Sequence, residues 1–316
     1  MTAYVTDANQ VRWTLPKPVA WRLEYTVGVP CDSFWMRCVW DADNLTKPED
    51  WVRFTAEHQG ERVFTGVVDE CEVGISAKGR LLEVSGRGMA ALLLDNEALG
   101  QDYQVATQKD IIHDHVRPYG ISVAPGAQLR AVDQFSVSTG SSEWSVVYEF
   151  ARYYGGVAPR FDREGRLVLT GWEDKTARLV DDSTPLISLV RRDRRYGVLS
   201  QVLMRDRWSG AVETVDNEFF LAAGGMARRI ITVPARSSYK AMRYSGQFQL
   251  DRSAAELKRM EVTVGQAFCA WPGDLVNVNR SGLDWNGQYR AAGVTVGMDE
   301  SGYWSRMELT VPDFTV

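Results

Sequence analysis

The sequence predicts a mainly β protein with an α+β insert, in which two related β-barrel domains flank a small α/β domain. Short stretches that alternate apolar and polar side chains, such as residues 21–25 and 52–56, recur over residues 1–90 with turn residues between them. Regular spacing of short strands and turns is typical of barrels and sandwiches. A hairpin pattern in residues 62–88 also returns, in a looser form, from Tyr289 onward.

The repeated hairpin shows the same order of features in both places. The first copy contains Gly66-Val67-Val68, the acids Asp69-Glu70, a turn at Lys78-Gly79 and the strand Leu81-Leu82-Glu83-Val84. The second contains Gly293-Val294-Thr295, the acids Asp299-Glu300, a turn at Ser301-Gly302 and the strand Met307-Glu308-Leu309-Thr310-Val311. The copies differ in loop length, which changes the free energy of a hairpin little. The repeat favours two related β-domains over a chance similarity of two ordinary hairpins.

We expect three parts, over residues 1–98, 99–180 and 181–316. The first is a β-barrel domain that ends in a short helix after Gly88. The second is the α/β domain: Thr107 can cap a helix, and a second helix begins near Ser142 and stops at Gly155-Gly156. A short hairpin over residues 157–170 follows the second helix.

The third part returns to strands and forms the second β-barrel domain. Its expected strands are residues 186–190, 198–205, 219–221, 229–233 and 246–250, followed by hairpins from Asp274 to Val311. One helix interrupts them, opened by the capping box Ser253-Ala254-Ala255-Glu256.

Composition describes a soluble globular chain and excludes several functions. Of the 316 residues, 45% are hydrophobic and 24% charged, and the net charge is −5. No segment is basic enough to hold duplex DNA through its phosphates, so we expect no specific nucleic-acid binding. The run Arg191-Arg192-Asp193-Arg194-Arg195 is the local exception, and we interpret it as a solvated or interface strand.

The chain shows no signal peptide and no apolar run long enough for a membrane span. We therefore expect it to be made and kept in a cytoplasm, or released by lysis. Its four cysteines, Cys31, Cys38, Cys71 and Cys269, lie far apart and form no C-x-x-C pair. Neither a disulfide framework nor a zinc knuckle fits that spacing, so we expect reduced, packed thiols.

Two motifs suggest ligand sites, and each has a structural explanation. Gly86-Arg87-Gly88-Met89-Ala90-Ala91 matches a dinucleotide-binding loop, but that loop needs a parallel βαβ crossover, whereas antiparallel hairpins precede it here. It is interpreted as a tight corner between a strand and a helix. His113 and His115 are two positions apart, so on a helix they point in different directions and cannot share a metal. His58 stands alone.

The acid-rich stretch Asp69-Glu70-Cys71-Glu72 offers carboxylates, yet on a strand Glu70 and Glu72 share the solvent face. No nucleophile elbow, phosphate loop or H-E-x-x-H motif occurs in the sequence. We therefore assign no catalytic, cofactor-binding or metal-binding residues, and expect no cofactor and no enzymatic activity.

Three short motifs in order carry a resemblance to a known family. Gly66-Val67-Val68-Asp69, then Ser85-Gly86-Arg87-Gly88, then Leu93-Leu94-Asp95 resemble the end of the first barrel in the late-control, baseplate-hub superfamily of phage tails and contractile injection systems. That superfamily includes the N-terminal part of type VI secretion spike proteins. Thr107-Gln108-Lys109-Asp110-Ile111 and Pro272-Gly273-Asp274-Leu275-Val276 also fit it, whereas Gly88 departs from the acid that is more usual there.

The resemblance implies a virion structural protein, assembled in a host bacterial cytoplasm and located in the tail baseplate. Hubs of this family are homotrimers whose chains each contribute two similar barrels, so that three chains match a sixfold tail tube to a threefold spike. The implied partners are other copies of this chain, the tail tube protein, the central spike protein and a tape-measure chain.

Two other functions compete with the hub. A tail-associated peptidoglycan hydrolase is an alternative because such domains are often fused to hub chains, although no hydrolase motif is found. A carbohydrate-binding adhesion module is the other alternative, motivated by 11 Trp and 12 Tyr residues. Those tryptophans are scattered along the chain, which fits strands and subunit interfaces better than one ligand cleft.

Overall fold

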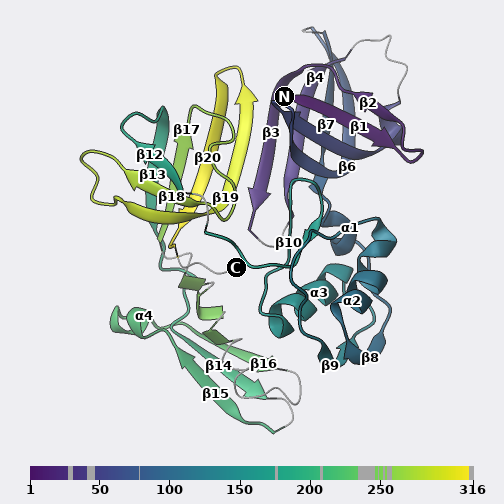
Figure 1. Cartoon of the computed structure of the whole chain (residues 1–316). Coiled ribbons are helices and arrows are strands. Elements are labelled where there is room, and N and C mark those ends of the chain that lie inside the picture. The colour runs from purple at the N-terminus through teal and green to yellow at the C-terminus, as the bar shows by residue number, and fades with distance from the viewer. Residues whose placement is uncertain are drawn as a thin grey trace. The chain divides into compact units, whose positions relative to one another are not determined.

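The computed structural model describes residues 1–27, 31–40, 47–77, 79–174, 177–206, 209–233, 246–247, 249–251, 253–254 and 258–312. The chain divides into two compact units (Figure 1). The first holds residues 1–173, 265–268 and 294–305, and the second holds residues 174–264, 269–293 and 306–316. The expected boundaries at residues 98 and 180 stay a prediction.

The first unit contains most of the helices and a long antiparallel sheet. Its strands are β1 Thr2–Asp7, β2 Arg12–Thr14, β3 Pro18–Thr26, β4 Ser33–Val39, β5 Trp51–His58, β6 Glu61–Ser76, β7 Gly79–Gly88, β8 Gln101–Ala106, β9 Val132–Val137, β10 Arg160–Phe161 and β11 Leu167–Val168. Its helices are η1 Pro48–Asp50, α1 Ala91–Leu94, α2 Gln108–His115, η2 Arg117–Tyr119, α3 Glu143–Tyr148 and the π-helical η3 Glu149–Tyr154.

Strands dominate the second unit. They are β12 Ala177–Asp181, β13 Leu186–Asp193, β14 Gln201–Asp206, β15 Val212–Asp216, β16 Arg228–Val233, β17 Lys258–Val264, β18 Leu275–Asn279, β19 Gly287–Asp299 and β20 Gly302–Thr310, with the short helix α4 Glu218–Ala222. The end of the β19–β20 hairpin, Val294–Ser305, belongs to the first unit.

The sheet of the first unit runs in the order β3-β4-β7-β6-β5-β1-β2. Its strands alternate buried and exposed side chains, as the sequence predicts, and the buried face is aromatic: Phe34 stacks on Phe54 with ring centroids 3.8 Å apart and meets the edge of Phe64. The mainly β prediction is confirmed. No pairing between β2 and β3 closes this sheet among the described residues, so the closure expected of a barrel is not found.

The helices of the first unit gather around the β8–β9 hairpin (Figure 1). Thr107 and Asp110 form a reciprocal capping box at the start of α2, and Gly120, at φ 70°, follows the turn that ends it. Ser142 caps α3 through the backbone N–H of Ser145. Both helix starts were predicted from these hydroxyl residues, whereas the hairpin between β8 and β9 was not.

The second unit repeats the strand order of the first. In the first sheet, the strands lie side by side in the order β3-β4-β7-β6-β5-β1. In the other, the order is β13-β17-β20-β19-β18-β12. If the six strands of each set are numbered as they occur along the chain, both sets have the same spatial order, which is second, third, sixth, fifth, fourth and first. The hairpins β6–β7 and β19–β20, matched in sequence, therefore hold equivalent positions. One pairing differs, because β12 and β18 are parallel whereas β1 and β5 are antiparallel.

Two strand predictions in the second unit are wrong. Residues 219–221 lie in helix α4, which the Asn217 side chain caps by accepting from the N–H of Phe220. Residues 246–247 and 249–250 are helical too, and Leu250 packs into the core beneath the sheet β15-β14-β16. Short apolar runs fit a strand and a buried helix equally well. Ala255 and Glu256 of the predicted capping box, and Lys78 of the predicted turn, lie outside the described residues.

Candidate functional site

The three motif segments of the first sheet meet at one arginine. The Arg87 guanidinium donates to both oxygens of Asp69, at 2.8 and 3.0 Å, and to both oxygens of Asp95, at 2.9 and 2.7 Å. Asp69 lies on β6 and Asp95 directly follows α1, so the arginine joins the hairpin to the helix. The hydrogen bonds from Arg87, and secondarily its charge, lower the pKa of the Asp95 carboxyl. A planar guanidinium that binds two carboxylates in this way fixes orientation as well as charge.

Glycines make this junction possible. A Cβ atom on Gly86 would lie 2.0 Å from the carbonyl oxygen of Val67, and one on Gly66 would lie 2.1 Å from that of Arg87. The pairing of β6 with β7 shifts register between Val68 and Glu70, which marks a bulge. The G-x-G-x-x-A match thus reflects a close approach of two antiparallel strands, and no βαβ crossover surrounds it.

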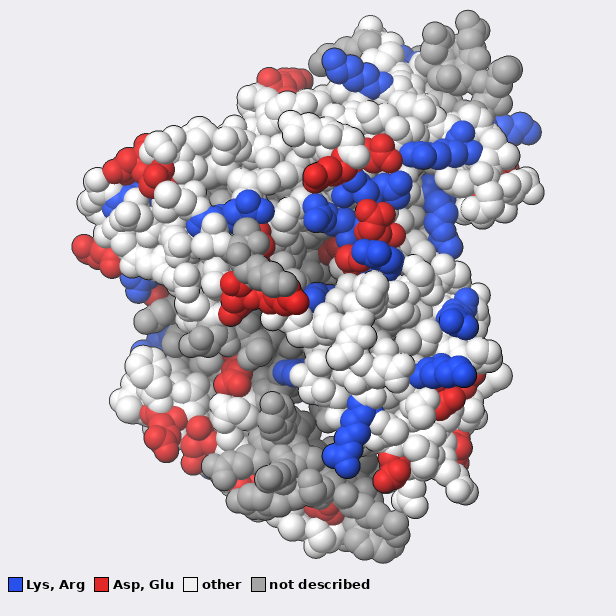
Figure 2. Space-filling model, viewed as in Figure 1, with Lys and Arg blue, Asp and Glu red and all other residues white. Residues whose placement is uncertain are grey.

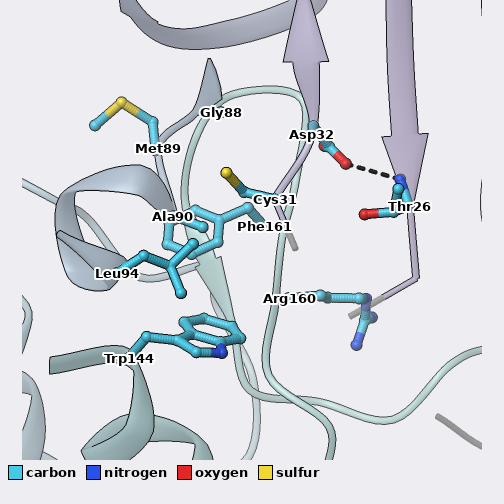
Figure 3. A pocket seen from close by; sticks show the side chains of 10 residues that line it. All are labelled: Thr26, Cys31, Asp32, Gly88, Met89, Ala90, Leu94, Trp144, Arg160 and Phe161. Atoms are coloured by element: carbon cyan, nitrogen blue, oxygen red, sulfur yellow. Dashed lines mark hydrogen bonds between the residues drawn. The ribbon is translucent and has the colours of Figure 1, made fainter. Parts of the chain in front are cut away.

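A pocket lies beside the same corner (Figure 3). Its walls are mostly apolar, and its ten lining residues are Thr26, Cys31, Asp32, Gly88, Met89, Ala90, Leu94, Trp144, Arg160 and Phe161. The backbone N–H of Thr26 donates to the Asp32 carboxylate at 2.8 Å. Arg160 is engaged elsewhere, because it donates to the carbonyls of Thr170 and Gly171 and lies over the ring of Trp172.

Two ionisable groups of the pocket have pKa values that burial shifts upward. Burial raises the pKa of Asp32 to about 7 and that of the Cys31 thiol to about 11. A thiol with that pKa stays protonated at neutral pH and is a poor nucleophile. An acid at position 88, more usual in the superfamily, would stand against Asp32, since the Cβ atoms would be 3.4 Å apart.

A buried polar network links the two main helices of the first unit. His115 Nδ1 lies 2.6 Å from Glu143, which also accepts from the hydroxyl of Tyr119 at 2.9 Å. On the other side of the ring, His115 Nε2 lies 3.0 Å from the hydroxyl of Tyr103, which donates to Asp114. His115 and Glu143 are almost fully buried. Both ring nitrogens of His115 have a partner, so the network connects α2 to α3 and fixes the orientation of the imidazole.

The remaining candidates are also placed separately. His113 is exposed and hydrogen-bonded to Asp114, whereas the ring of His58, at the end of β5, lies 4.8 Å from that of Phe268 and is tilted by 41° against it. Burial raises the pKa values of Cys38 and Cys71 to about 12 and 11. None of the four cysteines forms a disulfide. Within the described ranges, no three His, Cys, Asp or Glu side chains form a group able to hold a metal ion.

The surface carries no broad field of one charge on the face seen in Figure 2, where basic and acidic side chains lie interspersed. Every tryptophan in the described part of the chain is buried or half-buried. Trp208 lies outside the described residues. None of the helices described is both long and apolar enough to cross a membrane.

The fold matches solved structures of phage tail proteins. A 43 kDa tail protein of prophage MuSo2 from Shewanella oneidensis superposes with a TM-score of 0.81 at 16% identity over 100% of both chains. A tail protein from Neisseria meningitidis MC58 superposes with a TM-score of 0.77 at 17% identity, over 99% of this chain and 98% of the other. No family model matches the sequence. Nor does any curated protein match it.

The likeness extends to secretion machinery. An Escherichia coli component of the type VI secretion system, described as structurally similar to the T4 bacteriophage tail proteins gp27 and gp5, superposes with a TM-score of 0.56 at 11% identity, over 94% of this chain and 73% of the other. The chain therefore has the fold of phage tail proteins, shared with type VI secretion components. The resemblance predicted from the motifs around Gly66, Arg87 and Asp95 is confirmed at the level of fold.

Proposed function

We propose that this protein is a structural hub in the baseplate of a phage or phage-like tail, a homotrimer that joins a sixfold tail tube to a threefold central spike. The observation that carries the proposal is the strand order found twice in one chain, as β3-β4-β7-β6-β5-β1 and as β13-β17-β20-β19-β18-β12. Three copies with two such barrel-like modules can present six near-equivalent surfaces on one side and three on the other.

Two further observations support a structural role without enzymatic activity. The tail proteins from S. oneidensis and N. meningitidis share the fold over essentially the full length of the chain. The polar clusters around Arg87 and His115 are internally satisfied and connect elements of the fold. The partners of this hub are its own copies, the tube protein, the spike protein and a tape-measure chain, in a virion tail assembled in the host cytoplasm.

Two measurements test the proposal. Light scattering on the purified chain is expected to give three times the mass of 35.5 kDa, and electron microscopy is expected to show a ring with six lobes. A stable monomer at every concentration, or a ring without sixfold pseudosymmetry, contradicts it. Clearing of bacterial cell walls in a zymogram would favour a hydrolase, and sugar-dependent tryptophan fluorescence would favour an adhesion module.

A further inference from the structure

On one side, the second half of β6 has no partner strand among the described residues. Residues 61–67 of β6 pair with β5, and the register ends at Arg53 opposite Val67. Residues 68–76 pair with β7 on one side, and no described strand pairs with them on the other. Two apolar side chains on this stretch are exposed, Val73 at 45% and Ile75 at 75%. An unpaired strand with exposed apolar residues is a template for pairing with another chain.

Strand β13 likewise has one edge without a partner strand among the described residues. It pairs with β17 over its whole length and is the terminal strand of its sheet in the described part of the chain. Ile187 and Val190 are 62% and 40% exposed on it. An edge strand with exposed apolar side chains is unusual in a protein that stays alone, because it invites association.

The repeated strand order shows what belongs at these edges. In the first unit, the second half of β19 is the neighbour of β3, and the approach is close: a Cβ atom on Gly297 would lie 3.1 Å from the carbonyl oxygen of Trp21. By position in the repeat, β6 is the equivalent of β19 and β13 is the equivalent of β3. The same kind of pairing is therefore open to β6 and β13.

We infer that residues 68–76 of β6 in one copy pair edge to edge with β13 of a second copy. This inference rests on the proposed homotrimer and names its interface. The contact is head to tail, because it joins two different surfaces, so it closes into a ring when three copies complete the turn. Main-chain hydrogen bonds between the edges supply the affinity, and the exposed side chains supply the specificity.

The charges on the two edges are complementary. The free stretch of β6 carries the exposed acids Glu70 and Glu72, and β13 carries the exposed Arg192. None of these three side chains makes an ion pair with another described residue. Opposite charges on facing strands favour pairing, and like charges oppose it. A second copy of this chain thus fits each edge better than an edge of the same kind would.

The native cysteine on the free stretch allows a direct test. Cys71 lies within residues 68–76, so cysteines introduced one at a time into β13, as Ile187→Cys, Ser188→Cys, Leu189→Cys and Val190→Cys, scan the register of the contact. Mild oxidation is expected to give covalent dimers and trimers at one or two of these positions, since a disulfide needs Cα atoms about 5.5 Å apart. Adding Cys71→Ser must abolish these covalent dimers and trimers. Val212→Cys on β15, tested in the same way, must form no covalent dimers or trimers.

A charge exchange tests the same contact without a covalent bond. Glu72→Arg and Arg192→Glu are each expected to raise the concentration at which the trimer dissociates by about tenfold, and the double variant is expected to restore it. Asp133→Arg, on the exposed side of β9, serves as the matched control and changes nothing. A trimer that forms no Cys71 cross-link, and whose dissociation does not change with the charge exchange, contradicts this interface but not the proposed trimeric hub. A monomer overturns both.

Discussion

At the scale of single residues, the tightest constraint lies where β6 and β7 cross. Position 86 has no room for a side chain. A Cβ atom there would lie 2.0 Å from the carbonyl oxygen of Val67 and 2.8 Å from the Phe34 ring. Backbone cannot yield as a flexible side chain can, so any substitution must push two paired strands apart.

Gly86→Ala is therefore expected to lower the free energy of unfolding by about 2–4 kcal/mol. Gly171→Ala, outside residues 68–76 and with no atom within 4 Å of its Cβ position, is the control and should stay within about 0.5 kcal/mol of wild type. Urea unfolding followed by tryptophan fluorescence measures both. Equal effects of the two alanines would show that the close approach is not limiting.

Asp32 gives the protein a pH dependence of known sign. Burial raises the pKa of its carboxyl from an ordinary value near 3.8 to about 7, so the folded chain holds a proton that the unfolded chain releases. The stability that this proton confers is complete below about pH 4 and is lost as the pH rises through about 7.

Asp32→Asn keeps an oxygen for the N–H of Thr26 but cannot ionise. Its melting temperature, relative to wild type, is expected to rise between about pH 4 and pH 8 and then to level off. Thermal melts across this range measure the difference, with exposed Asp133→Asn as the control. Melting curves of wild type and Asp32→Asn that run parallel at every pH would show that Asp32 ionises freely in the folded chain.

At the scale of elements, helices α2 and α3 depend on one buried carboxylate. Glu143 accepts from both His115 and Tyr119, so removing it leaves two polar groups unpaired in an apolar surrounding. We expect Glu143→Ala to lower the free energy of unfolding by about 2–4 kcal/mol, and Tyr119→Phe, which removes one bond, by about 1 kcal/mol. Chemical denaturation measures the free energy of unfolding of both variants. A larger loss for Tyr119→Phe than for Glu143→Ala would show that Glu143 is not the group on which the network depends.

Elements whose signals are local could be predicted from the sequence, and contacts that depend on register could not. The capping residues Thr107 and Ser142 and the turn at Ser301-Gly302 are each indicated by residues within a few positions, and the structure confirms all three. Helix α4 was missed although Asn217 is a usual capping residue, because the apolar run after it suggested a strand.

The junction at Arg87 was predicted only as a corner. Its two carboxylate partners are 18 and 8 residues away in the chain: Asp69 lies where the pairing of β6 with β7 shifts register, and Asp95 lies at the end of α1. Likewise the sequence relates His115 only to His113, two positions away, because nothing in it ties His115 to Glu143, 28 residues further on. Both contacts are products of tertiary packing.

At the scale of the whole molecule, net charge and local charge predict opposite effects of salt. Each chain carries −5, so overall repulsion between copies would be relieved by salt and association would strengthen. The acidic edge of β6 and the basic edge of β13 instead attract at contact distance, where the interaction is larger, and salt would weaken it.

We expect the attraction between the two edges to outweigh the repulsion between net charges. The trimer should therefore dissociate more readily as NaCl rises from about 0.05 M to about 0.5 M, a range over which the Debye screening length shortens severalfold. Analytical ultracentrifugation at several salt concentrations measures this. The double variant Glu72→Ala/Arg192→Ala should lose most of the dependence. Tighter association at high salt would assign control to the net charge instead.

The placement of Val294–Ser305 in the first unit has a consequence for synthesis on the ribosome. Domains usually fold as they emerge, N-terminus first, but this unit cannot be completed until nearly the whole polypeptide has been translated. Until then, the edge of β3 that pairs with β19 is exposed in the nascent chain. Other nascent chains on the same messenger RNA expose the same edge close by. Slow translation of the residues before Val294 would lengthen that interval. A chaperone that covers β3 would reduce association between nascent chains during it.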